Sequence, residues 1–401
     1  MSSSFLFLRV TAIAVLFSLF AGFLGSSSFH FNAEKDDYEA KWQQVSEFES
    51  KGLPKSALKI VEDIYDMALA DNNDEQIIKA SLYRFKYVNM IEDDGYVLNI
   101  QNLEKEVLRM PPVASAFAYL LLAEFYSSYY YNNYYQISQR SRIADFKPED
   151  LKTWDESLFK DKIIKSYNKA LADTLKSIEI TDYPQLIKDA EYGVETYPSL
   201  YDFLIFQAIS KFQNNNINYY YYYNPNDKAD FEFTDPVVLD VAENFVKSEI
   251  NGADSISYSF QVYSLFKEWL RFRLSRENET DAIVNADLLR MEIMLEKSRF
   301  AKKDEAYLLG LKKMHTEYAK YPALTAIDLK IANYLVTQGA KYKPSDTTTY
   351  QYAPYRNEAY NLLEQAIELY PEKKRSYKLK NLQKQIEEPQ FSFTIPAYHN
   401  T

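Results

Sequence analysis

The stretch PKSALKIVEDIYDMALA, residues 54–70, predicts the fold class of this chain. Its apolar residues recur at steps of three and four, which places one apolar stripe along a helix. These residues are Ala57, Leu58, Val61, Ile64, Tyr65, Ala68 and Leu69. Pro54 stands just after Gly52, at a place where a first-turn proline is tolerated. We therefore expect an amphipathic helix here, and an earlier helix that ends at Gly52.

The same periodicity continues along most of the chain. It is clear over residues 74–92, 307–319 and 359–370. Tyr-Pro pairs mark further helix boundaries, because the residue before a proline resists the α conformation. Two helix starts are also predicted. Thr153 and Glu156 fit a capping box, and Asp235-Pro236 joins an N-cap to a first-turn proline.

These signals predict an all-α fold. The 401 residues include only eight glycines, so glycine-rich phosphate loops and tight β-hairpins are disfavoured. Small residues at helix crossings (Ala57, Ala359, Ala366) let neighbouring helices approach closely, as in tetratricopeptide repeats. We expect an irregular α-solenoid of antiparallel helix pairs, tetratricopeptide-like, with a short strand-like C-terminal tail.

The helical pattern predicts five segments. Residues 1–27 are predicted to be a signal peptide or N-terminal anchor, 34–216 a first helical half and 235–388 a second. Residues 217–234, rich in tyrosine and asparagine, separate the halves as a loop. Residues 389–401 begin with FSFTI, whose alternation is typical of the start of a β domain. Residues 341–354 (KYKPSDTTTYQYAP) are expected to form a second loop.

The N-terminal segment predicts export. Arg9 precedes an apolar run, residues 10–24, and small residues 25–27 follow it. That run is shorter than the roughly 20 residues of a spanning helix, so an uncleaved anchor is the alternative. We expect a protein of the periplasm or the outer-membrane-associated envelope, without other membrane contact. The absence of cysteine excludes thiol nucleophiles, zinc–thiolate sites and an internal thioester.

Little in the sequence predicts chemistry. His30, His315 and His399 lack a partner at metal-ligand spacing, and nucleophile-elbow, phosphate-loop and zinc-protease motifs do not occur. We expect no catalytic residue, cofactor or metal. A net charge of −11 makes nucleic acid an unsuitable partner, because binding it depends on basic side chains.

Two tyrosine clusters are candidate contact surfaces. Exposed rings can stack on sugars or pack against peptides. Tyr126, Tyr130 and Tyr134 share one helical face. The alternative to a contact surface is that this face packs between helices. The second cluster belongs to the 217–234 loop, where ligand contact and simple loop filling both remain open. It contains Tyr219, Tyr220 and Tyr221.

Several stretches, in their order, resemble the N-terminal helical region of the large alpha-2-macroglobulin-like proteins of Bacteroidetes. They include KGLPKSALKIVEDIY (51–65), DDGYVLNIQNLEKEV (93–107), YPSLYDFLIFQAISKF (197–212) and YRNEAYNLLEQAIELYP (355–371). The resemblance covers residues 36–396, nearly all of the chain after the N-terminal segment. In that family β-sandwich macroglobulin domains follow the helical region, and many members trap proteases through a thioester.

The resemblance implies a non-catalytic, exported helical scaffold, the N-terminal part of a protease-inhibitor-type envelope protein. Its expected partners are proteins, among them the downstream macroglobulin domains, which lie beyond the residues that carry the likeness. No functional residue is carried over, since the thioester motif is absent. A stand-alone periplasmic tetratricopeptide-like module that binds peptides or proteins is the alternative. A helical glycan-binding protein is a third class.

Overall fold

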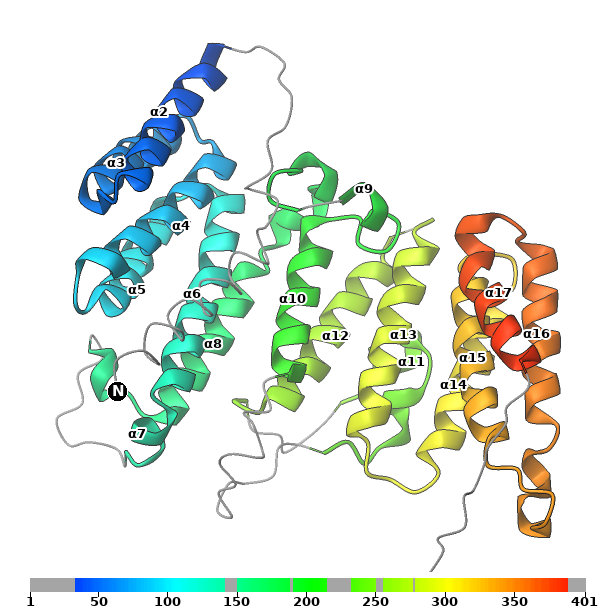
Figure 1. Ribbon diagram of the computed structural model, residues 1–401. Coiled ribbons are helices and arrows are strands. Elements are labelled where there is room, and N and C mark those ends of the chain that lie inside the picture. The colour runs from blue at the N-terminus through cyan, green and yellow to red at the C-terminus, as the bar shows by residue number, and fades with distance from the viewer. Residues whose placement is uncertain are drawn as a thin grey trace, which may run out of the picture. The chain divides into compact units, whose positions relative to one another are not determined.

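The chain is all-α. The computed structural model describes residues 33–140, 150–187, 190–214, 232–249, 255–276 and 278–388, and these form helices joined by loops (Figure 1). Within this part of the chain β pairing is limited to two isolated bridges, Glu179 with Ser199 and Phe233 with Ser298. The predicted signal peptide (1–27), nearly all of the 217–234 loop and the strand-like tail lie outside the described residues.

Two compact units divide the chain. The first contains residues 1–228 and 254–262, and the second contains residues 229–253 and 263–401. The change at residue 228 falls inside the 217–234 segment that the sequence predicts as a loop. Residues 254–262 return to the first unit, so the chain crosses the boundary between the units more than once. The boundary passes through helix α12 (Tyr258–Leu274).

In the first unit, helices that follow one another along the chain pack together. The contacts join α2 to α3, α3 to α4, α4 to α5 and α6 to α8 (Figure 1). The helices are α2 (Ala33–Ser50), α3 (Pro54–Ala70), α4 (Asp74–Ile91), α5 (Gly95–Glu106), α6 (Pro112–Asn132), α7 (Tyr134–Ser138), α8 (Glu156–Ala170), α9 (Ala190–Gly193) and α10 (Leu200–Asn214). Short 3₁₀ turns join them: η2 (Val107–Arg109), η3 (Leu151–Thr153), η4 (Asp173–Ser177) and η5 (Ile180–Asp182).

Helix α3 has the stripe that its sequence predicts. Ala57, Val61 and Ile64 are completely buried, and Pro54 is the first residue of the helix. Gly52 precedes it with a φ of 69°, in the left-handed region where a glycine costs least. Asn73 then caps α4 by accepting a hydrogen bond from Gln76 N–H. The helical hairpin is therefore defined by local signals at both ends.

Two helix starts differ from the sequence expectation. The N-cap of α8 is Asp155, which accepts from Leu158 N–H, whereas Thr153 belongs to the preceding 3₁₀ turn. The predicted capping box at Thr153 is thus wrong, because Asp155 lies closer to the helix start and takes the cap.

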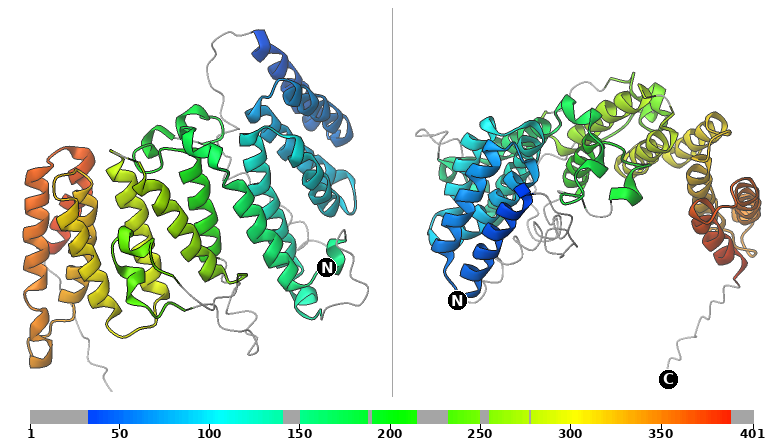
Figure 2. Two further views of the ribbon diagram at one scale, coloured as in Figure 1. Left: turned by 180° about the vertical axis from the view of Figure 1, so that it is seen from behind. Right: turned by 90° about the horizontal axis from the view of Figure 1, so that it is seen from above.

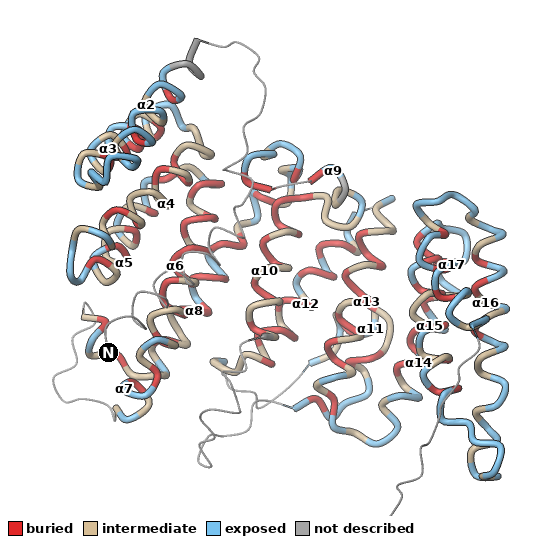
Figure 3. The backbone as a smooth tube through the Cα atoms, in the orientation of Figure 1, coloured by how far each residue is buried: buried red, intermediate tan, exposed pale blue. Residues whose placement is uncertain are grey.

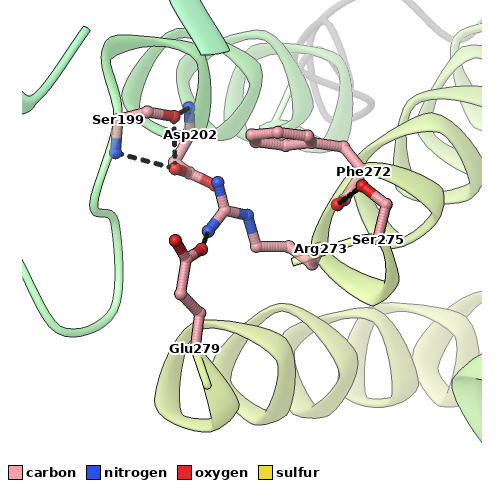
Figure 4. Close-up of polar contacts among 6 residues, drawn as sticks. All are labelled: Ser199, Asp202, Phe272, Arg273, Ser275 and Glu279. Atoms are coloured by element: carbon pink, nitrogen blue, oxygen red, sulfur yellow. Dashed lines mark hydrogen bonds and ion pairs between the residues drawn. The ribbon is translucent and has the colours of Figure 1, made fainter. Parts of the chain in front are cut away.

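A capping box is present at the start of α10, formed by Ser199 and Asp202 (Figure 4). There the Asp202 carboxylate accepts from the Ser199 N–H at 2.9 Å and hydroxyl at 2.6 Å, and both residues are buried.

The second unit also packs its helices in chain order. Contacts join α13 to α14, α14 to α15, α15 to α16 and α16 to α17, which Figure 2 shows in yellow to red. Its helices are α11 (Ala242–Phe245), α13 (Thr280–Lys297), α14 (Lys303–Glu317), α15 (Leu324–Gly339), α16 (Tyr355–Leu369) and α17 (Lys373–Glu387). The 3₁₀ turns are η6 (Pro236–Leu239) and η7 (Thr347–Tyr352). Asp235 caps η6, so the helix start that the sequence predicts at Asp235-Pro236 begins a 3₁₀ turn and not an α-helix.

A buried ion pair stands at the centre of the second unit. Arg290 is completely buried on α13, and its Nε lies 2.7 Å from Asp287 Oδ1. Its remaining N–H groups donate to the carbonyl oxygens of Val238 and Asp240 beside η6. The guanidinium therefore donates to a carboxylate and to two carbonyl oxygens, and a buried cation needs such partners. The contact fixes η6 against α13.

The last two described helices, α16 and α17, each bury one side only. Ala359, Leu363 and Ala366 form the buried side of α16, and Leu379 and Leu382 anchor α17. Most other positions of these two helices are exposed (Figure 3). By contrast, α6 is buried over most of its circumference. A helix that buries one side only can still present the other side to a partner.

Candidate functional site

The tyrosines of the 124–136 cluster do not form a contact surface. Tyr126 and Tyr130 are 1% and 0% exposed, and Tyr134 is 8% exposed. The prediction of a surface made by these three residues is wrong, and the alternative of packing between helices holds. The Tyr130 ring lies 5.9 Å from the Phe159 ring on α8 and 5.7 Å from the Tyr134 ring, measured between centroids. The Tyr126 ring lies 5.6 Å from the ring of Trp154. The cluster is a seam between α6, α7 and α8.

Carboxylates of the first unit accept hydrogen bonds from this seam. The Tyr126 hydroxyl donates to Glu104, and the hydroxyl of Tyr167 on α8 donates to Glu124. Lys211 of α10 lies 2.6 Å from the second oxygen of Glu124 and balances its charge. Burial raises the pKa of the Tyr126 phenol, and the hydrogen bond to Glu104 raises it further. These phenols stay protonated and act as structural donors.

The second predicted cluster, Tyr219, Tyr220 and Tyr221, lies outside the described residues. Its function as a contact surface stays a prediction.

A different tyrosine-rich segment is exposed and ordered. It is the 341–354 loop, which the sequence predicts as a plain loop and which contains the 3₁₀ turn η7. Asp346 caps that turn by accepting from the Thr348 N–H at 3.0 Å and hydroxyl at 2.6 Å. The Thr349 hydroxyl lies 2.9 Å from Lys343 N and 2.7 Å from the Asp346 carbonyl oxygen. Local hydrogen bonds therefore fix the loop without a hydrophobic core.

Two rings project from this loop. Tyr342 is 39% exposed and Tyr350 is 50% exposed, and their centroids lie 5.9 Å apart with an interplanar angle of 55°. The Tyr350 hydroxyl donates to the Pro344 carbonyl oxygen at 3.1 Å, which holds that ring in place. Lys341 lies over the neighbouring ring of Tyr352 at 5.6 Å. The tyrosines are visible in the sequence, but nothing there indicates that their rings are held in place, because the contacts join residues six to eleven positions apart.

One histidine has a notable partner. His315 on α14 places Nδ1 2.6 Å from Asp328 Oδ1 on α15, and the Asp328 side chain is only 2% exposed. Burial raises the pKa of Asp328, and the hydrogen bond from His315 opposes that shift. Within the described residues no hydroxyl group hydrogen-bonds to this histidine. The pair lacks a nucleophile, and its observable effect is to join α14 to α15.

Comparisons with protein-family models, with curated proteins and with solved structures found no match. Among the described residues no group of three or more histidine and carboxylate side chains is arranged to hold a metal ion. No described helix combines the length and apolar character needed to cross a bilayer.

The 341–354 loop is thus the candidate site that the geometry supports best. Tyrosine supplies a large, rigid contact area and loses little conformational entropy on binding. Single exposed apolar residues are common on protein surfaces. Here two adjacent exposed rings, one of them held by a hydrogen bond, lie on a loop that its own hydrogen bonds order, which makes a prepared contact. The arrangement suits binding, because the polar groups of Asp346 and Thr349 are used within the loop itself and leave the two rings as its exposed contact area.

Proposed function

We propose that this chain is a non-catalytic, exported helical scaffold whose 341–354 loop contacts another protein. The observation that carries the proposal is the pair of exposed rings, Tyr342 and Tyr350, on a loop ordered by its own hydrogen bonds. Interface hot spots are enriched in tyrosine, and a loop that is already ordered loses less entropy when it binds.

The helices, we propose, form an irregular α-solenoid of antiparallel pairs, tetratricopeptide-like. Support comes from the packing of each helix on its sequence neighbours within each unit, and from the buried alanines Ala57, Ala359 and Ala366. Small-angle scattering tests this point. A compact chain of this length has a radius of gyration of about 21 Å, and an array exceeds it clearly. A value near the compact one would contradict the solenoid.

We further propose that this scaffold is the N-terminal part of an alpha-2-macroglobulin-like envelope protein. The ordered sequence likeness over residues 36–396 supports it, and the partner is then a macroglobulin domain of the same protein. The test is the size of the native product, detected in its own cells with an antibody to the helical region. A band several-fold above 47.0 kDa supports the proposal. A band near that mass favours the stand-alone periplasmic binding module.

Site-specific photo-crosslinking tests the loop itself. Benzoylphenylalanine replaces Tyr350 in one variant and Tyr135, an equally accessible tyrosine at 69% exposure, in the control. We expect a discrete crosslinked product from position 350 and none from position 135. In the longer protein this product is internal and changes the peptide map of one chain. Equal product patterns from the two positions would contradict a function of the loop in binding.

Glycan capture is the second candidate, because the same two exposed rings could stack on a sugar. The rings are tilted by 55°, so they offer one ring face at a time rather than a flat platform. Soluble glycans should then raise the melting temperature of the wild type but not of Tyr350→Ala. An unchanged melting temperature in both proteins would dispose of this candidate.

A further inference from the structure

The last described helix is strongly basic, although the protein as a whole carries a net charge of −11. Helix α17 contains six lysine and arginine residues and one glutamate. Lys373, Lys380 and Lys384 recur at helical spacing with Tyr377, so these four residues share one side of the helix. All four are exposed, Tyr377 at 57%. We name this side the basic stripe. It extends over twelve residues, Lys373 to Lys384, which is about 16 Å along the helix.

The basic stripe points away from the body of the second unit. Leu379 and Leu382 bury the opposite side of α17 against α15 and α16. Arg375 makes a two-pronged ion pair with Asp281 of α13, and Arg356 donates to the Ile386 carbonyl oxygen at 3.1 Å. The helix is therefore held firmly. The lysines of the stripe make no ion pair with other described residues.

The first described helix has the opposite charge. Helix α2 contains six carboxylates and two lysines. Glu39, Gln43 and Glu47 recur at steps of four and are exposed, so they lie on one side, the acidic stripe. Tyr38 and Val45 occupy the buried side. Neither Glu39 nor Glu47 forms an ion pair within the part of the chain that the structure describes.

The two stripes match in spacing as well as in charge. On α17, Lys373 and Lys380 are seven residues apart, about 10 Å along the helix, with Tyr377 between them. On α2, Glu39 and Glu47 are eight residues apart, about 12 Å, with Gln43 between them. We propose that the basic stripe of one copy docks on the acidic stripe of a second copy. Such a contact joins two different surfaces, so its repetition from copy to copy produces a head-to-tail ring or an open chain.

Charge complementarity within the same molecule favours a second copy over other anionic partners. A lipid surface attracts basic helices most strongly when they also insert apolar side chains. The leucines of α17 are buried in the second unit and cannot insert, which leaves Tyr377 as the one large exposed ring of the stripe. Surface ion pairs are individually weak, so this association is salt-sensitive and appears at high protein concentration.

The absence of cysteine from the chain allows a direct test with the full-length protein. One preparation carries Gln43→Cys and the other Tyr377→Cys, and they are mixed at about 100 µM under mild oxidation. We expect the mixed disulfide dimer to exceed either like-with-like dimer, and to diminish in about 0.5 M NaCl. Reversal of two charges, K373E with K380E, should lower its yield about tenfold, since two attractive pairs become repulsive. Adding E39K with E47K to the other preparation should restore it.

Two results would overturn the proposal. The first is a mixed dimer no more abundant than the like-with-like dimers. The second is loss of the mixed dimer on K373E with K380E without recovery when E39K and E47K are added. Binding to phosphatidylglycerol vesicles in place of mixed-dimer formation would assign the basic stripe to a lipid surface. Circular dichroism of each variant confirms that the helices remain folded, and the 341–354 loop is untouched in all of them.

Discussion

Replacing Asp287 by alanine tests how the centre of the second unit is held together. The side chains of Arg290 and Asp287 are 0% and 3% exposed in their 2.6 Å ion pair. Removing one partner of such a pair typically costs about 3–5 kcal/mol, because the other charge stays buried. In this variant Arg290 would keep its hydrogen bonds to the carbonyl oxygens of Val238 and Asp240. We therefore expect the lower end of that range, about 3 kcal/mol.

Urea unfolding followed by circular dichroism measures this cost. The matched control is Glu305→Ala, which removes an ion pair to Lys302 whose side chains are 71% and 75% exposed. That change should cost less than about 0.5 kcal/mol. Replacing both buried partners, Asp287→Leu with Arg290→Met, should cost less than Asp287→Ala alone, since no buried charge is left. A loss under about 1 kcal/mol for Asp287→Ala would refute the reasoning.

Three further changes have expected outcomes. Gly310→Ala would place a Cβ 2.2 Å from a backbone carbonyl oxygen of η6, so urea unfolding should show a loss of about 1–3 kcal/mol. Tyr167→Phe removes the donor to Glu124 and should cost about 2 kcal/mol, whereas the same change at an exposed tyrosine should cost nothing measurable. Burial and the neighbouring Glu243 raise the pKa of Glu317 from 4.5 to about 7. Its contribution to stability is thus complete below about pH 4.5 and is lost as the pH rises through 7. Between pH 5 and 8 the stability of Glu317→Gln should fall less than that of wild type, by up to about 1 kcal/mol after solvent screening.

Local signals in the sequence were enough to place helices α3 and α4. The stripe of residues 54–70 predicts α3 at its observed bounds, Pro54–Ala70, because periodicity, the first-turn proline and Gly52 agree. The pattern over residues 74–92 likewise predicts α4, Asp74–Ile91. At residue 153 two candidate caps lay two positions apart, and only the helix axis decides which of them faces the free N–H groups.

The candidate site was harder to predict, because the type of a residue does not determine whether its side chain is exposed. Tyr126, Tyr130 and Tyr134 have the same side chain and similar spacing to many surface residues, yet α8 covers them. Tyr342 and Tyr350 gave no periodic signal, and their order comes from threonine hydroxyls within the loop. Arg290 and Asp287 are three residues apart on a helix, a spacing that surface ion pairs share, so the local sequence does not indicate that this pair is buried.

The packing of each helix on its neighbours in sequence bears on how the protein reaches its fold. Within each unit contacts between helices, such as α2 with α3 and α16 with α17, join segments separated by three residues. Loops this short cost little entropy to close, so each hairpin can form soon after its residues are available. Chains dominated by local contacts fold in microseconds to milliseconds. The chain can therefore begin to fold hairpin by hairpin from one end, before its distant parts are available.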